Sequence, residues 1–117
     1  MHALGYDYAG LMSEDDALAR DIQAAADRTC ESVWRLPLDE RMTEGTHAKI
    51  ADRKNLTSEM MAGASMGAAF VSQFVCEPVK YAHLDIAGPA YRTKPRGIFP
   101  SEATGFGTEI LLEYVLL

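Results

Sequence analysis

Residues 81–90, with the sequence YAHLDIAGPA, constrain the fold of this chain more than any other stretch. Side chains alternate along a β-strand, so a strand here has two unlike faces. One face would carry Tyr81, His83, Asp85 and Ala87, and the other would carry Ala82, Leu84, Ile86 and Gly88. The pattern predicts a strand between an apolar core and a more polar face, ended by Gly88-Pro89. Open α/β sheets place their binding sites just beyond such strand ends.

Residues 13–32 predict an amphipathic helix on the outside of the fold. Ser13 is its expected N-cap, and Asp16 three residues later completes a capping-box pattern. The remaining surface of the helix is charged, whereas one face is apolar at helical spacing. That face consists of Ala17, Leu18, Ile22, Ala25 and Ala26.

Two further helices are expected, and both are apolar. Residues 57–71, capped by Thr57 or Ser58, are small or apolar at almost every position, which predicts burial on more than one side. Gly63 and Gly67 are costly in a helix interior, so close packing against another backbone is expected there. Residues 109–117 predict a C-terminal helix, capped by Thr104 or Thr108, with its apolar end packed down.

Shorter segments connect these elements. Residues 2–5 predict the tail of a strand that runs into a glycine turn, and residues 33–38 predict an extended segment closed by Pro37. A helical turn is expected over residues 39–43, with a break at Gly45, and residues 89–108 predict a long loop rich in proline and glycine. Helices that alternate with strands indicate a layered α/β arrangement.

The length and the net charge of the chain limit the number of domains and the kinds of partner that it can bind. The 117 residues fit one domain, and the net charge of −6 argues against nucleic acid or an anionic membrane as a partner. The longest apolar stretch, residues 60–71, is shorter than the about 20 residues that a membrane span needs, so no membrane contact is expected. Cys30 and Cys76 predict free thiols, and a single disulfide between them stays open.

His83 and Asp85 are the first candidates for chemistry. Zinc needs three or four protein ligands, and the further candidates show no recognisable metal-binding spacing. Those candidates are His2, Asp7, His47 and Asp52. The sequence also lacks the GxSxG motif of a nucleophilic serine. The favoured interpretation is that His83 and Asp85 are buried polar groups, each satisfied by hydrogen bonds.

Three loops carry weaker candidates. Asp52 and Asn55 face either a site or a neighbouring subunit, although turn formation explains them more simply. Residues 103–108, ATGFGT, have the composition of an anion-binding helix start, and the simpler interpretation is a flexible approach to a capped helix. Arg92, Lys94 and Arg96 form a small basic patch, for which a solvated loop is the expected explanation.

Six segments of the chain, taken in sequence order, resemble the C-terminal part of the leucyl aminopeptidase family, the cytosol aminopeptidases with two metal ions. They are residues 3–5, 10–38, 51–55, 62–74, 81–88 and 103–117. The segments WRLPL (residues 34–38) and AHLDIAG (residues 82–88) carry most of the resemblance, because their order and separation are specific together. The resemblance covers nearly the whole chain. It implies that residues 1–117 are one C-terminal segment of a catalytic domain, an incomplete three-layer fragment of a mixed sheet flanked by helices.

The resemblance also implies an activity. Family members remove N-terminal residues, often leucine, from peptides, and two divalent cations, zinc or manganese, activate the attacking water. Complete relatives are expected to be cytoplasmic and hexameric. The family's metal ligands lie in an Asn-Thr-Asp-Ala-Glu-Gly-Arg motif and in segments before it, none of which this sequence contains. We therefore expect no catalytic residue, no metal ligand and no cofactor in this chain, and no activity of the chain alone.

The family resemblance implies that this chain contributes part of the substrate pocket. Ala87 and Ala90 match the residues that line the pocket for the first side chain of the substrate. Ala90 is small, which widens that pocket relative to some relatives, while Tyr81 stands where tryptophan is usual. Two alternatives stay open. The chain is either a non-catalytic module that docks into a relative or forms a homo-oligomer, or a truncated gene product with no independent role.

Overall fold

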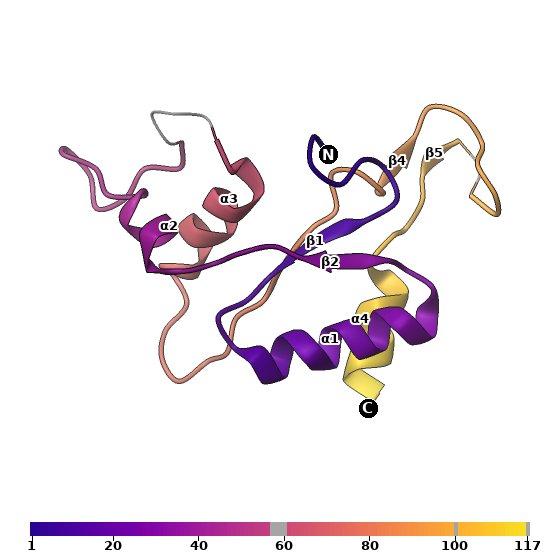
Figure 1. The fold of residues 1–117 in the computed structure, drawn as a ribbon, viewed down its shortest axis with the longest axis horizontal. Coiled ribbons are helices and arrows are strands. Elements are labelled where there is room, and N and C mark those ends of the chain that lie inside the picture. The colour runs from indigo at the N-terminus through magenta and orange to yellow at the C-terminus, as the bar shows by residue number, and fades with distance from the viewer. Residues whose placement is uncertain (57–60, 100, 117) are drawn as a thin grey trace.

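The computed structural model, which describes residues 1–56, 61–99 and 101–116, is an α/β arrangement built on a three-stranded mixed sheet (Figure 1). The strand order is β2 (Val33–Arg35), β1 (Ala9–Met12) and β3 (His83–Asp85). β1 pairs in parallel with β2 and antiparallel with β3. The predicted α/β class, with a mixed sheet flanked by helices, is confirmed.

The two faces of the sheet pack against different clusters of side chains. On one face, Leu84 of β3 packs with Leu11 of β1 against the helices α1 (Asp16–Thr29) and α4 (Thr108–Leu116). On the other face, Tyr81 and Met12 pack near α3 (Gly63–Ser72). Leu11 and Met12 are adjacent and both buried, yet they belong to different clusters, as strand alternation requires. The predicted alternation along residues 81–85 is therefore confirmed.

The N-cap of α1 differs from the prediction. Asp15, and not Ser13, is the cap, because the N–H of Leu18 donates to its Oδ1 at 2.8 Å. The hydroxyl of Ser13 instead donates to the carbonyl oxygen of Tyr81 at 2.7 Å, which ties the end of β1 to the chain before β3. The apolar face is otherwise as predicted, except that Ala17 is exposed and Ala19 is buried.

α4 lies against α1, and its N-terminus is capped by a residue distant in sequence (Figure 1). The carboxylate of Glu31 accepts the N–H of Gly107 and the N–H of Ile110, each at 3.0 Å. The prediction of Thr104 or Thr108 as the cap is wrong in this respect, since Thr104 accepts from Phe106, just before the helix. The glycine-rich start of α4 does hold an anion, and that anion is the protein's own Glu31.

The end of α4 is not packed down within this chain. Ile110 is fully buried, whereas the exposed fractions of the remaining apolar side chains are about half or more. They are Leu111 at 52%, Leu112 at 59%, Val115 at 76% and Leu116 at 73%. The expected burial of the apolar end is therefore wrong for Val115 and Leu116, because α1 covers only the side of α4 that carries Ile110 and Tyr114. Leu117 lies outside the described residues.

α3 is buried on one side only, which corrects the second helix prediction. Its buried residues are Ser65, Ala68 and Ala69, while Val71 is 42% exposed. A Cβ atom added at Gly63 or Gly67 would meet no atom within 4 Å, so the expected close packing of these glycines is absent here. The predicted caps Thr57 and Ser58 lie outside the described residues.

The remaining segments hold three strands that the sequence did not predict, namely β1 and the two strands of a hairpin in the long loop. The expected strand tail at residues 2–5 is a turn, and the strand begins later, at Ala9. The helical turn before Gly45 is confirmed as α2 (Glu40–Glu44), and the extended segment at residues 33–38 contains β2. The long loop carries a small hairpin of β4 (Tyr91–Arg92) and β5 (Glu102–Ala103).

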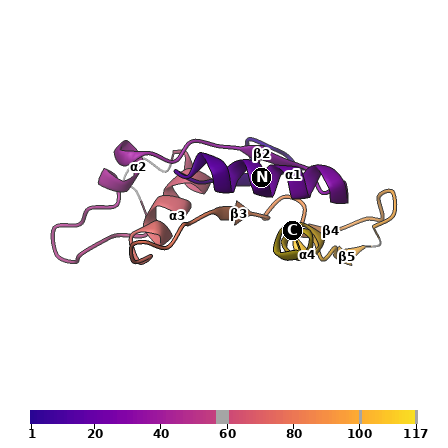
Figure 2. The ribbon, with the colours of Figure 1, turned by 90° about the horizontal axis from the view of Figure 1, so that it is seen from below.

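The molecule is thin, with principal extents of 47 × 33 × 17 Å (Figure 2). Its thickness agrees with an incomplete layered fragment. Both cysteines, Cys30 and Cys76, are free thiols, as predicted. In the part of the chain that the structure describes, no helix is long and apolar enough to cross a membrane.

Candidate functional site at the end of β3

The residues that follow β3 form a tight turn. The side chain of Asp85 accepts the N–H of Ala87 at 3.0 Å, and the N–H of Ala90 donates to the carbonyl of Ile86 at 3.0 Å. Thr104, from the far side of the hairpin, donates its N–H to Ala90 at 3.0 Å. These bonds fix the backbone at Ala87 and Ala90, the two residues for which the family resemblance implies a role in substrate binding.

Gly88, within this turn, approaches the N-terminal segment closely. A Cβ atom at this position would lie 2.2 Å from the carbonyl oxygen of Gly5, well inside contact distance. Only glycine therefore allows the end of β3 to sit against residues 5 and 6. This approach brings the turn of residues 2–7 to the same end of the sheet as Ala87.

A cavity of about 630 Å³, which we name the Ala87 cavity, opens beside this turn. Its wall includes His2 and Leu4 from the N-terminal turn, Ser65 from α3, and Asp85 and Ala87. Its volume falls within the range of about 300–1,000 Å³ found for small-molecule sites. Ala90 does not line this cavity.

Ala87 also borders a second cavity of about 430 Å³, which we name the basic cavity. Arg92, Lys94 and Arg96 line it together with Tyr6. The basic patch predicted from the sequence is therefore part of a recess beside the turn after β3, and not only a solvated loop.

His83 and Asp85 are half-buried and hydrogen-bonded to different groups. Nδ1 of His83 lies 3.0 Å from the hydroxyl of Tyr81, and that hydroxyl donates to the carbonyl of Ala68 at 3.2 Å. Because a phenol has one proton, both bonds form together when Nδ1 of His83 is the donor. Burial raises the pKa of Tyr81. The predicted hydrogen bonds of His83 and Asp85 are therefore present, whereas the predicted burial of these side chains is only partial.

The other predicted candidates are scattered. Nε2 of His47 lies 3.0 Å from a guanidinium nitrogen of Arg53, and Asp52 and Asn55 are exposed in the loop after α2. Across residues 1–56, 61–99 and 101–116, no group of three or more His, Cys, Asp or Glu side chains is placed to hold a metal ion. The described residues therefore do not fit a two-metal centre.

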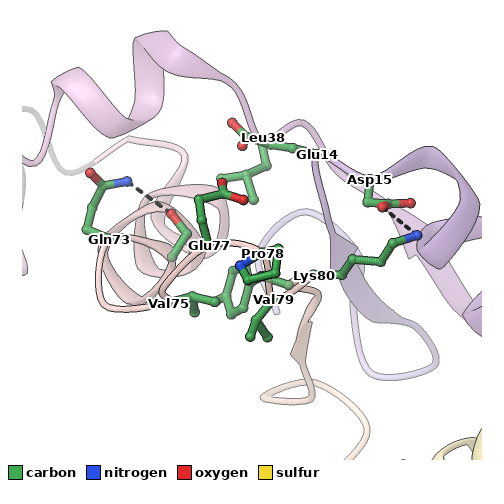
Figure 3. A pocket seen from close by; sticks show the side chains of 11 residues that line it. Glu14, Asp15, Leu38, Gln73, Val75, Glu77, Pro78, Val79 and Lys80 are labelled. Carbon is green, nitrogen blue, oxygen red and sulfur yellow. Dashed lines mark hydrogen bonds and ion pairs between the residues drawn. The ribbon is translucent and has the colours of Figure 1, made fainter.

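A third cavity, of about 570 Å³, lies around Lys80 and Asp15 and shares no lining residue with the Ala87 cavity (Figure 3). Nζ of Lys80 is 2.9 Å from Oδ2 of Asp15. The hydrogen bond from Leu18 and then the contact with Lys80 lower the pKa of Asp15, and the same contact raises the pKa of Lys80. This pair stabilises the start of α1 and is remote from the turn after β3.

The fold and the site together define part of an α/β domain in which a strand end with small side chains borders a recess. The model of the cytosol aminopeptidase family, catalytic domain, matches residues 1–112. The chain therefore belongs to the cytosol aminopeptidase family, which confirms the resemblance read from its segments.

Individual relatives agree with this assignment. The chain is 46% identical over 114 residues to a probable cytosol aminopeptidase of Chlamydia caviae, and 46% identical over 114 residues to one of Cyanothece sp.. Each match covers 97% of this chain and 23% of the relative, so the chain spans about a quarter of the length of the relatives it matches.

Two solved structures have the same fold. The bottromycin maturation enzyme BotP in complex with Mn superimposes with a TM-score of 0.90 at 38% identity, over 97% of this chain and 25% of that one. A tomato leucine aminopeptidase mutant superimposes with a TM-score of 0.88 at 39% identity, over 99% of this chain and 22% of that one.

Proposed function

We propose that this chain forms the part of an aminopeptidase catalytic domain that borders the substrate, with Ala87, and in a complete domain Ala90 also, lining the pocket for the first side chain of a peptide. The observation that carries the proposal is the position of Ala87, directly after β3 and on the wall of the Ala87 cavity. Membership of the cytosol aminopeptidase family supports peptides as the substrates.

The contribution of these residues is to bind and orient. A methyl side chain at Ala87 leaves room for the branched side chain of a leucine residue, while the bond from Ala87 to Asp85 keeps the wall in place. The apolar and small residues around the cavity favour an apolar side chain over water. Ala90 is half-buried, and the bond from its N–H to the carbonyl of Ile86 holds it in the same turn.

The hydrolytic step itself needs groups that the described residues do not provide. Two divalent cations, which in this family polarise the peptide carbonyl and activate water, would be held by other residues of a complete catalytic domain. Manganese is supported by the structure of BotP in complex with Mn, and zinc by the resemblance alone. A cytoplasmic location belongs to the same proposal and is supported by relatives described as cytosol aminopeptidases. A hexameric assembly is implied by the family resemblance alone.

The pocket is testable without turnover. The isotope-labelled chain is titrated with the dipeptide Leu-Ala and followed by the amide signals of Ala87 and Ala90, which are expected to shift. Ala87→Leu should fill the wall and abolish the shifts. Ala103→Leu, on the exposed strand β5, is the matched control and should leave them unchanged. Equal binding of Leu-Ala by the Ala87→Leu variant would contradict the proposal.

A second candidate function is a non-catalytic module that associates with another copy of itself. The exposed apolar side chains on α4, among them Leu112, Val115 and Leu116, favour it, because such a surface is usually covered by a partner. Light scattering after size-exclusion chromatography tests this idea. A dimer that Leu112→Glu dissociates would support it, and a monomer at micromolar concentration would count against it.

A further inference from the structure

The basic cavity concentrates positive charge on an acidic chain. Arg92, Lys94 and Arg96 line it, and Asp7 is their counter-charge. Three positive charges less one negative charge leave +2 around the cavity, whereas the whole chain carries −6. A local field of this sign attracts an anionic group.

Asp7 demonstrates that one carboxylate reaches two of these cations at once. Its Oδ1 lies 3.3 Å from a guanidinium nitrogen of Arg92, and its Oδ2 lies 2.9 Å from one of Arg96. The 3.3 Å contact is long for a charged hydrogen bond, which is usually about 2.7–2.9 Å. Lys94 makes no ion pair with any residue that the structure describes.

Arg92 is also incompletely satisfied. Its side chain is only 10% exposed, and its Nε is the one buried side-chain nitrogen or oxygen, among the described residues, without a hydrogen-bond partner. A buried donor without a partner is unfavourable. A guanidinium in this state, with Lys94 beside it in the same wall, is suited to a second carboxylate.

We infer that the basic cavity binds the carboxylate of an acidic peptide side chain, so that the pocket bordered by Ala87 accepts glutamate or aspartate as the first residue of a peptide. The inference rests on the proposed function, in which Ala87 lines the pocket for that residue. Ala87 is the link, because it borders both the Ala87 cavity and the basic cavity. The basic residues therefore determine specificity and take no part in bond cleavage.

The test compares two dipeptides that differ only in charge. Glu-Ala and the isosteric Gln-Ala are titrated into the labelled 117-residue chain, with the Ala87 amide as the reporter. Glu-Ala should bind about two- to fivefold more tightly, the range expected for an exposed charge pair. The double variant Lys94→Gln, Arg96→Gln changes exposed residues, and it should remove this preference.

Two further variants test whether the preference comes from the basic residues of this cavity. Asp7→Asn frees both guanidinium groups and should strengthen binding of Glu-Ala. The double variant Arg20→Gln, Lys49→Gln removes the same charge from exposed positions on α1 and on the loop after α2, and it should keep the preference. That loop lies at the opposite end of the molecule from the β4–β5 hairpin (Figure 1).

The outcomes separate this inference from the proposed function. If Glu-Ala and Gln-Ala shift the amide signal of Ala87 with equal affinity, the inferred preference for an acidic side chain is wrong, whereas the proposed pocket is still supported. If Leu-Ala, Glu-Ala and Gln-Ala all leave Ala87 unchanged, the pocket itself is wrong, and the inference fails with it. A preference that persists in the Lys94→Gln, Arg96→Gln variant would assign it to other residues and overturn the inference.

Discussion

The carboxylate of Glu31 accepts the backbone N–H of Ile110 at 3.0 Å, and this bond joins the end of α1 to the start of α4. The other carboxylate oxygen accepts the N–H of Gly107. Glu31 is buried, and Ile110 is a fully buried member of the core cluster on that face of the sheet. A single side chain therefore satisfies two N–H groups at a helix start, where intrahelical partners are lacking.

Glu31→Ala should destabilise the chain more than any exposed substitution on α1. It leaves two buried N–H groups without an acceptor, which costs about 1–3 kcal/mol for each such loss. Urea denaturation followed by circular dichroism measures the effect. Glu113→Gln, which removes the ion pair between Arg28 and Glu113, is the control and should cost about 1 kcal/mol or less. Equal effects of the two substitutions would contradict the capping role.

Substitutions at two glycines should have opposite signs. Gly88→Ala forces a Cβ atom to within 2.2 Å of the Gly5 carbonyl oxygen, so the turn after β3 must move and the midpoint of unfolding should fall. Gly67→Ala adds a methyl group in open space on α3, where alanine is favoured over glycine by about 1 kcal/mol. Thermal unfolding of both variants is the measurement. A stabilising Gly88→Ala would show that residues 5 and 88 are not in contact.

The stability of the chain should depend on the ionisation of Asp15. Its bonds from Leu18 and to Lys80 lower its pKa below the ordinary value of 3.8. A group whose pKa is lowered by folding stabilises the fold above its unfolded pKa. This contribution is present above about pH 4 and is lost as the pH falls through the lower folded value.

Asp15→Asn tests the pH dependence. The amide keeps an oxygen that can cap the helix but has no charge, so the variant should lose less stability than the parent between neutral pH and pH 3. The acid transition of each protein is followed by circular dichroism. Parallel curves for the two proteins would exclude Asp15 as a contributor. Glu14→Gln, at an exposed neighbouring position, serves as the matched control.

Local sequence patterns predicted those elements in which the spacing of neighbouring side chains shows which face is buried. The alternation along β3 follows from side-chain spacing alone and was confirmed. The apolar face of α1 was confirmed at four of its five predicted positions, since Ala17 is exposed. β1 was missed because it has only four residues, one of them Gly10, and its burial comes from β2 and β3 on either side. No local signal carries that information.

Contacts between residues that are far apart in the chain could not be predicted from local sequence patterns. Glu31 accepts the N–H of Gly107, which lies 76 positions later and just before α4, and Ser13 bonds to Tyr81 across 68 positions. The basic residues of the loop could be seen in the sequence, but the pairing of Arg92 with Asp7, 85 positions earlier, could not. Ala87 itself was identified only through the family resemblance, since an alanine carries no chemical signal.

The most direct test of the account is hydrolysis of leucine amide by the purified 117-residue chain with added Mn²⁺ or Zn²⁺. We propose that the chain supplies a wall of the pocket, and its described residues hold no group of side chains that fits a metal ion. We therefore predict no turnover above that of the metal ion alone. Robust, metal-dependent release of leucine that increases in proportion to the chain concentration would contradict the account.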